Sequence, residues 1–162
     1  MYVEELNMGN NILSSSLIDN ILNEVYLINK GVRSCALLED TSFSCDTEEE
    51  SVYQIEQLIL RNGLNYFWVK HEKSEDYADN VYYTVYIYKY EHQRYILSYL
   101  ENKMRDQNPL IYEWMMGKCL GYSDEAMEQF LTHIVIDKMV EFAEKKKGGE
   151  ENVLKPEQTD KM

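Results

Sequence analysis

Residues 81–90 constrain the fold of this chain more than any other segment. Their sequence, VYYTVYIYKY, is rich in β-branched and aromatic residues and predicts a β-strand. Because successive side chains of a strand point to opposite faces, the segment has an apolar face, expected on the core, and a face dominated by tyrosine. The apolar face carries Val81, Tyr83, Val85 and Ile87, and the other carries Tyr82, Thr84, Tyr86, Tyr88 and Tyr90.

Two further segments are predicted to be strands. Residues 64–70 (LNYFWVK) are aromatic and β-branched, and residues 32–43 are apolar in the middle. The polar segment 71–80 reads as a loop, and strands separated in this way most simply pair as an antiparallel hairpin. The tyrosine row then either packs under a helix or faces a partner protein. A stacking platform for bases is disfavoured, because such platforms lie in positive grooves.

Helical periodicity and capping signals predict helices over most of the remaining chain. The expected helices span 12–30, 47–62, 91–106, 109–120 and 123–147. The expected signals at their ends are Ser16 with Asp19, Thr47 with Glu50, and Ser123 as N-caps, Pro109 at a first helical position, and Gly31, Gly63 and Gly121 as stops.

Each amphipathic helix also has a predicted buried face. These faces consist of Val52, Ile55, Leu58 and Ile59 in the second helix, Tyr95, Ile96, Tyr99, Leu100 and Lys103 in the third, and Met127, Phe130, Leu131, Ile134, Met139 and Phe142 in the last.

The order of these signals favours an α+β fold, because strand signals are followed by a run of helices and do not alternate strictly with them. We expect a small, largely antiparallel sheet packed with four or five helices and a C-terminal helical hairpin. The 162 residues suffice for a hydrophobic core. A single domain is expected over 1–147, followed by a polar, disordered tail at 148–162.

Acidic residues are concentrated in one interval of the chain. The 16 basic and 29 acidic side chains leave a formal net charge of −13, and no Lys or Arg lies between Arg33 and Arg61. One interpretation is a solvated surface with acids at a helix N-terminus. The other is a surface complementary to a basic partner, because opposite potentials speed encounter and select partners. The candidate partner-binding residues are Glu39, Asp40, Asp46, Glu48, Glu49 and Glu50, with Tyr82, Tyr86 and Tyr88 of the tyrosine face.

Composition and motifs disfavour several classes of function. The net charge opposes direct binding to nucleic-acid phosphates. No apolar run of about 18 residues predicts a membrane span, and the N-terminus lacks the features of a secretory signal, so a cytoplasmic protein is expected. Cys35, Cys45 and Cys119 are expected to be reduced thiols, and neither they nor the histidines show a metal-binding spacing. No catalytic motif is found, and no cofactor or metal is predicted.

Residues 114–130 have the outline of a helix-turn-helix. In a DNA reader the second helix presents Arg, Lys, Asn or Gln to base edges. Here that helix opens with Asp124 and Glu125, which would repel phosphates. A helical hairpin used for packing is therefore favoured. A transcriptional regulator stays an alternative, as does a small enzyme of unrecognised type.

The runs HQRYILSYLENK (92–103) and EWMMGKCLGYSDEAMEQF (113–130) resemble small uncharacterised accessory proteins of Firmicute phages and mobile elements, most specifically from Gly117 to Phe130. By analogy, this resemblance implies a protein that antagonises host defences by occupying nucleic-acid sites. With the net charge, it leads to the hypothesis of a non-enzymatic, phage-encoded binding protein that acts in the cytoplasm of a bacterial host cell and has an anti-CRISPR-like or other anti-defence role. The expected partner is a host protein with a basic surface, and a homodimer is left open.

Overall fold

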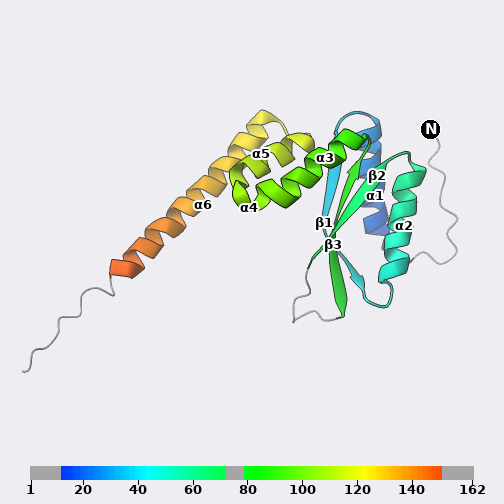
Figure 1. Cartoon of the computed structure of the whole chain (residues 1–162), viewed down its shortest axis with the longest axis horizontal. Helices are drawn as coiled ribbons and strands as arrows, with labels where there is room; N and C mark the ends of the chain where they lie inside the picture. The colour runs from blue at the N-terminus through cyan, green and yellow to red at the C-terminus, as the bar shows by residue number, and fades with distance from the viewer. Residues whose placement is uncertain (1–11, 72–78, 151–162) are drawn as a thin grey trace, which may run out of the picture. The chain divides into compact units, whose positions relative to one another are not determined.

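The computed structural model describes residues 12–71 and 79–150 (Figure 1). The elements are α1 (Ser15–Asn29), β1 (Cys35–Ser44), α2 (Glu48–Arg61), β2 (Asn65–Lys70), β3 (Asn80–Tyr88), α3 (Glu91–Tyr99), a π-helical turn η2 (Leu100–Met104), α4 (Arg105–Gln107), α5 (Pro109–Cys119) and α6 (Asp124–Glu150). This order confirms the α+β fold. Most of the expected loop 71–80 and the end of the expected tail lie outside the described residues.

The chain divides into two compact units, Met1–Tyr122 and Ser123–Met162. The sheet and the helices up to α5 belong to the first unit, and α6 belongs to the second. The domain expected over 1–147 includes the start of the second unit, and it stays a prediction. The helix α6 ends at Glu150, which lies past the expected domain boundary at residue 147.

The described strands form a three-stranded antiparallel sheet in the order β1-β3-β2. The predicted pairing of the two aromatic strands is confirmed, and β3, which has the strongest strand signal, occupies the centre. In one row across the sheet, Leu37 and Phe67 both lie opposite Tyr86. The register of β1 shifts between Leu38 and Thr41, which adds one residue to β1 as a β-bulge.

The bulge determines which side chains of β1 reach each face of the sheet. Before it, Ala36 and Leu38 pack with the first core, on the face of the sheet that α1 and α2 cover, whereas after it Phe43 does so. The second core lies on the opposite face and includes Tyr86 and Tyr88. Because the side-chain period of a strand is two, the change from even to odd positions requires the extra residue. Without the bulge, Phe43 would point to the opposite face.

Helices cover both faces of the sheet (Figure 1). On one face α1 and α2 pack with the predicted core side of β3, where Val81, Val85 and Ile87 are buried. On the other face α3, η2 and α5 cover Tyr86 and Tyr88. Of the two interpretations of the tyrosine row, packing under helices is therefore the correct one for these two residues.

The signals at the ends of the helices are partly confirmed. Gly31 and Gly121 take positive φ angles of 71° and 83°, which suit glycine at a helix end. The N-cap of α1 is Ser14, not Ser16: Ser14 Oγ accepts a hydrogen bond from the Leu17 amide at 3.3 Å. Thr47 lies at the N-cap position of α2 but makes no capping hydrogen bond, so the predicted capping box is absent; its hydroxyl donates to the Ser44 carbonyl at 3.4 Å.

The predicted buried face of the third helix is wrong in part. Leu97 and Leu100 are buried, whereas Tyr95, Ile96 and Tyr99 are exposed. Side chains three residues apart share a helix face, so seating Leu97 and Leu100 on the sheet turns Tyr95 and Tyr99 away from it. The buried stripe of α2 is as predicted: Ile55, Leu58 and Ile59 are buried and the half-buried Val52 packs against them.

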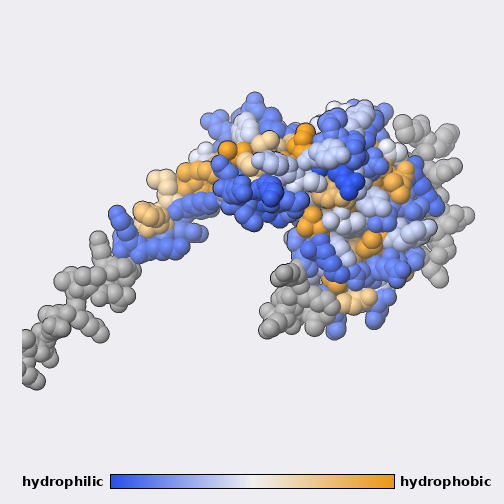
Figure 2. Space-filling view, in the orientation of Figure 1, coloured by the Kyte–Doolittle hydropathy of each residue, from blue (hydrophilic) through white to orange (hydrophobic). Residues whose placement is uncertain are grey.

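The second unit is described over the single helix α6. Ser123 caps it as predicted, accepting a hydrogen bond from the Ala126 amide at 3.1 Å. The predicted buried face is wrong in part: Met127 is buried and Leu131 and Ile134 are half-buried. Phe130, Met139 and Phe142 are exposed. Apolar residues are accordingly visible at the surface of α6 (Figure 2). Among the described helices, none has both the length and the apolar character to cross a membrane.

Candidate functional site

The structure separates the acidic candidate residues into two groups. Glu39 and Asp40 lie at the bulge of β1, and Glu39 is exposed and contributes to the electrostatic environment of Arg105. Asp46, Glu49 and Glu50 are exposed at the β1–α2 turn and in the first turn of α2. On the order of 15 Å of strand separates the groups, so they do not form one patch.

Glu48 takes part in an internal network instead of facing outward. Its Oε1 accepts hydrogen bonds from Lys70 Nζ at 2.9 Å and from the Tyr83 hydroxyl. The hydrogen bond to Glu48 raises the pKa of Lys70. Because β3 and β2 supply these partners, Glu48 anchors the start of α2 to the sheet and is not free to meet a partner protein.

The outer face of α2 adds apolar residues to the exposed acids. Glu49, Tyr53 and Leu60 are spaced i, i+4 and i+11, which puts them within about 40° of one another around the helix. Tyr53 is 56% exposed and Leu60 is 44% exposed. We had not predicted these two as binding residues. The available signal was their position off the buried stripe that includes Ile55 and Leu58.

The tyrosine candidates do not form an exposed surface. Tyr86 is 1% exposed and Tyr88 is 2% exposed, and Tyr82 is half-buried. Their expected role as partner-binding residues is therefore contradicted for Tyr86 and Tyr88, because α3, η2 and α5 cover that face. Of the exposed tyrosines, Tyr53 lies nearest in sequence to the acidic group.

A polar network accounts for the buried hydroxyl of Tyr86. Glu101, on the π-helical turn, accepts hydrogen bonds from Tyr86, from the Tyr112 hydroxyl at 3.3 Å and from Arg105 at 2.5 Å. Burial, and then the hydrogen bond to Glu101, raise the pKa of Tyr86. These contacts join β3 to η2 and α5, so this group of residues has a structural role.

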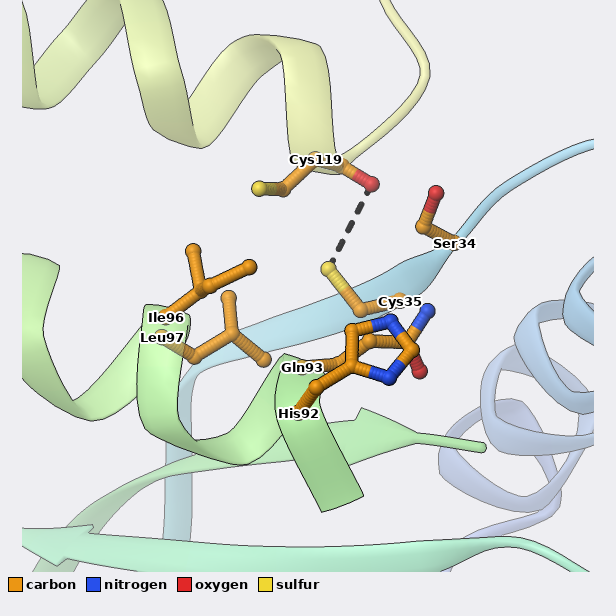
Figure 3. A pocket seen from close by; sticks show the side chains of 7 residues that line it. All are labelled: Ser34, Cys35, His92, Gln93, Ile96, Leu97 and Cys119. Atoms are coloured by element: carbon orange, nitrogen blue, oxygen red, sulfur yellow. Dashed lines mark hydrogen bonds between the residues drawn. The ribbon is translucent and has the colours of Figure 1, made fainter. Parts of the chain in front are cut away.

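A small hollow lies on the same side of the sheet as this network (Figure 3). Its volume is about 140 Å³, and it is lined by Ser34, Cys35, His92, Gln93, Ile96, Leu97 and Cys119. Cys35 begins β1, Cys119 ends α5, and the other lining residues include the first turn of α3. The Cys35 thiol donates a hydrogen bond to the Cys119 carbonyl oxygen at 3.4 Å. Since Ser34 and His92 are exposed, the hollow reaches solvent.

The pKa values of the two thiols in the hollow are shifted in opposite directions. A hydrogen bond from Cys35 lowers the pKa of Cys119 to about 7 against the opposing effect of burial. The interaction with Cys119, followed by burial, raises the pKa of Cys35. The lower pKa of Cys119 favours its thiolate near neutral pH, and the thiolate is the nucleophilic form of cysteine. The sequence predicts reduced thiols at both positions but does not indicate that they lie together, because 84 residues separate them.

Comparison of the sequence with known protein families and with curated proteins, and of the fold with solved structures, finds no match. Over the described part of the chain, no group of three or more His, Cys, Asp or Glu side chains is placed to hold a metal ion.

Proposed function

We propose that this chain is a binding protein, of phage or mobile-element origin, that blocks a host protein with a basic surface, such as a nucleic-acid-binding defence component. The observation that carries the proposal is the outer face of α2 with the turn before it. Glu49 and Glu50 are exposed one turn before the exposed Tyr53, and Asp46 is exposed in the β1–α2 turn. The resemblance of residues 117–130 to phage accessory proteins supports the proposed origin.

The chemistry of this face suits such a partner. Exposed acids attract a basic surface over about 10 Å at moderate salt and accelerate encounter. An aromatic side chain beside them can then hold the complex, because tyrosine is enriched among residues that dominate interface energies. Leu60 extends the apolar part of the surface. In this arrangement the acids set the association rate, and Tyr53 sets the dissociation rate.

The experiment compares what variants capture from a bacterial lysate. The tagged wild type, Asp46→Lys/Glu49→Lys/Glu50→Lys and Tyr53→Ala are tested beside Asp19→Lys/Asp106→Lys/Glu141→Lys. The last variant makes the same charge change at exposed acids elsewhere. We expect a protein retained by the wild type and by this control but lost by the other two variants. An identical set of captured proteins for all four would refute the assignment to α2.

Binding to DNA is the discriminating test for the regulator alternative. The first turn of α6 carries Asp124 and Glu125, and an acidic first turn repels phosphates. We therefore expect no shift of duplex DNA at low salt. A salt-sensitive complex with DNA would instead favour the regulator.

We also propose that α6 pairs with α6 of a second copy in antiparallel orientation. Met139 is 66% exposed and Phe142 is 67% exposed, and Val135, one turn before Met139, lies on the same face. Asp124, Glu125 and Glu128 lie near the start of the helix, and Lys145, Lys146 and Lys147 lie near its end. An antiparallel pair would set the acids of one copy against the lysines of the other and cover the apolar stripe.

Sedimentation of the whole chain over a range of concentrations tests this pairing. We expect a dimer for the wild type and a monomer for Met139→Glu/Phe142→Glu. The control Gln129→Glu/His133→Glu adds the same charge at exposed positions outside that stripe and should stay dimeric. A wild type that is monomeric at every concentration would contradict the pairing, as would a dimer that survives the Met139→Glu/Phe142→Glu change.

A further inference from the structure

Two cysteines that are distant in the sequence share one solvent-connected hollow. Cys35 is buried at the start of β1, and Cys119 is half-buried at the end of α5. In Figure 3 both side chains lie around the same space, with the Cys35 thiol directed at the carbonyl of Cys119. The protein-binding face of α2 does not involve either residue, so this pair has no role in the function proposed above.

The hollow can admit a small molecule. Its volume of about 140 Å³ exceeds the roughly 10–15 Å³ that a cavity needs on the same measure to hold one water. The lining combines apolar side chains, Ile96 and Leu97, with the polar groups of Ser34, His92 and Gln93. A molecule of the size and polarity of hydrogen peroxide therefore fits between the polar rim and the thiols.

We propose that Cys119 and Cys35 form a redox-active pair, in which Cys119 reacts with a small peroxide in the hollow and Cys35 completes an intramolecular disulfide. The lowered pKa of Cys119 supports this order of events, because it supplies thiolate near neutral pH. Cys35, which stays protonated and buried, is the second thiol to react.

The reaction balances with hydrogen peroxide as the oxidant. The Cys119 thiolate attacks one peroxide oxygen, the O–O bond breaks, and the departing hydroxide takes a proton to form water. This leaves a sulfenic acid on Cys119. The sulfur of Cys35 then attacks the sulfenic sulfur, the S–O bond breaks, and the Cys35 proton leaves with the hydroxide as a second water. Both thiols are oxidised and the peroxide is reduced to two waters.

The product would tie β1 to α5 across the side of the sheet that these elements share. A disulfide between residues 84 positions apart closes a long loop of the unfolded chain, which stabilises the folded state in proportion to the logarithm of loop length. Oxidation should therefore raise the melting temperature of the first unit, and a thiol reductant should reverse the change.

The third cysteine is an internal control. Cys45 is exposed in the turn between β1 and α2 and lies outside the hollow. If exposure alone decided reactivity, peroxide would modify Cys45 before the two buried or half-buried thiols. If the geometry of the hollow decides it, the Cys35–Cys119 disulfide should form first.

The experiment treats the full chain with hydrogen peroxide at neutral pH, followed by peptide mapping without reductant. We expect a peptide joined through Cys35 and Cys119 while Cys45 is still reduced, and the same product in Cys45→Ser. In Cys35→Ser, treated at about pH 9 because Cys119 then lacks the neighbour that lowers its pKa, a dimedone adduct should accumulate at Cys119, because the second thiol is missing. Oxidation of Cys45 ahead of Cys119, or no dimedone adduct at Cys119 in folded Cys35→Ser, would overturn the proposal.

Discussion

Replacing Tyr86 by alanine is expected to unfold the first unit instead of weakening a binding surface. The Tyr86 ring stacks on Phe67 with a centroid distance of 4.5 Å and an interplanar angle of 9°. Its hydroxyl donates to Glu101, whose side chain is only 7% exposed. Removing the side chain therefore creates a cavity in the second core and takes a hydrogen-bond donor from a buried carboxylate.

The magnitude follows from these two losses. Truncating a buried aromatic residue to alanine costs about 3–5 kcal/mol, and losing a hydrogen bond to a charged group costs about 1.5–3 kcal/mol. Because the losses overlap in one substitution, we expect on the order of 5 kcal/mol in total. A domain is stable by about 5–15 kcal/mol, so Tyr86→Ala should leave little folded protein. Tyr86→Phe keeps the stacked ring and should cost only the hydrogen bond.

Urea and thermal denaturation followed by circular dichroism measure these free energies of unfolding. The matched control is Tyr53→Ala, which removes a tyrosine that is 56% exposed and should change stability by about 0.5 kcal/mol or less. The expected order of stability is wild type and Tyr53→Ala, then Tyr86→Phe, then Tyr86→Ala. A melting temperature of Tyr86→Ala equal to that of the wild type would refute the reasoning, since a ring stacked in a core cannot be removed at no cost.

Three further measurements test other features. Burial raises the pKa of Tyr86 and of Tyr112 above the value in the unfolded chain, so their contribution to stability is complete below about pH 10 and declines as the pH rises further. The urea concentration at the midpoint of unfolding should therefore fall above about pH 10, and it should fall less steeply with pH in Tyr112→Phe. Alkylation of Cys119 by iodoacetamide should have a midpoint near pH 7, moved upward in Cys35→Ala, and equal midpoints would contradict the stabilising role of Cys35. Gly121→Ala should destabilise the protein by more than about 1 kcal/mol, because φ at this position is +83° and the added Cβ would lie 3.2 Å from the Val32 carbonyl oxygen. Gly31→Ala also places alanine at a positive φ, but without a close contact, so its destabilisation should be smaller. Thermal melts of the two variants compare the effects.

Local patterns were sufficient for the types of most elements and for several of their ends. The alternation in residues 81–90 predicted β3 and the division of its two faces, which is confirmed. Pro109 and Ser123 marked the starts of α5 and α6 correctly. These features depend on backbone preferences and on hydrogen bonds within a few residues, so the sequence contains the information directly. The acidic interval was likewise visible, although its use in binding stays a prediction.

The candidate site was harder to predict from the sequence, because packing brings its residues together. In the sequence nothing distinguishes Glu48 from Glu49 and Glu50, yet in the structure Lys70 of β2 and Tyr83 of β3 donate hydrogen bonds to it. The exposure of Tyr53 was predictable from its position off the buried stripe of α2, but no local pattern marks an exposed tyrosine as a binding residue. The residues available for binding a partner are those whose side chains remain exposed after the helices have packed on both faces of the sheet.

By itself, then, the sequence determined the strands, most of the helices and the acidic character of the chain, since all three arise from neighbouring residues and composition. Only the tertiary structure decided that α3, η2 and α5 cover the tyrosine face, that a bulge turns Phe43 toward the first core, and that Cys35 and Cys119 share one hollow. The physical reason is that these three outcomes depend on contacts between segments far apart in the chain. Which face of a strand or helix becomes buried is decided by the element that packs on it.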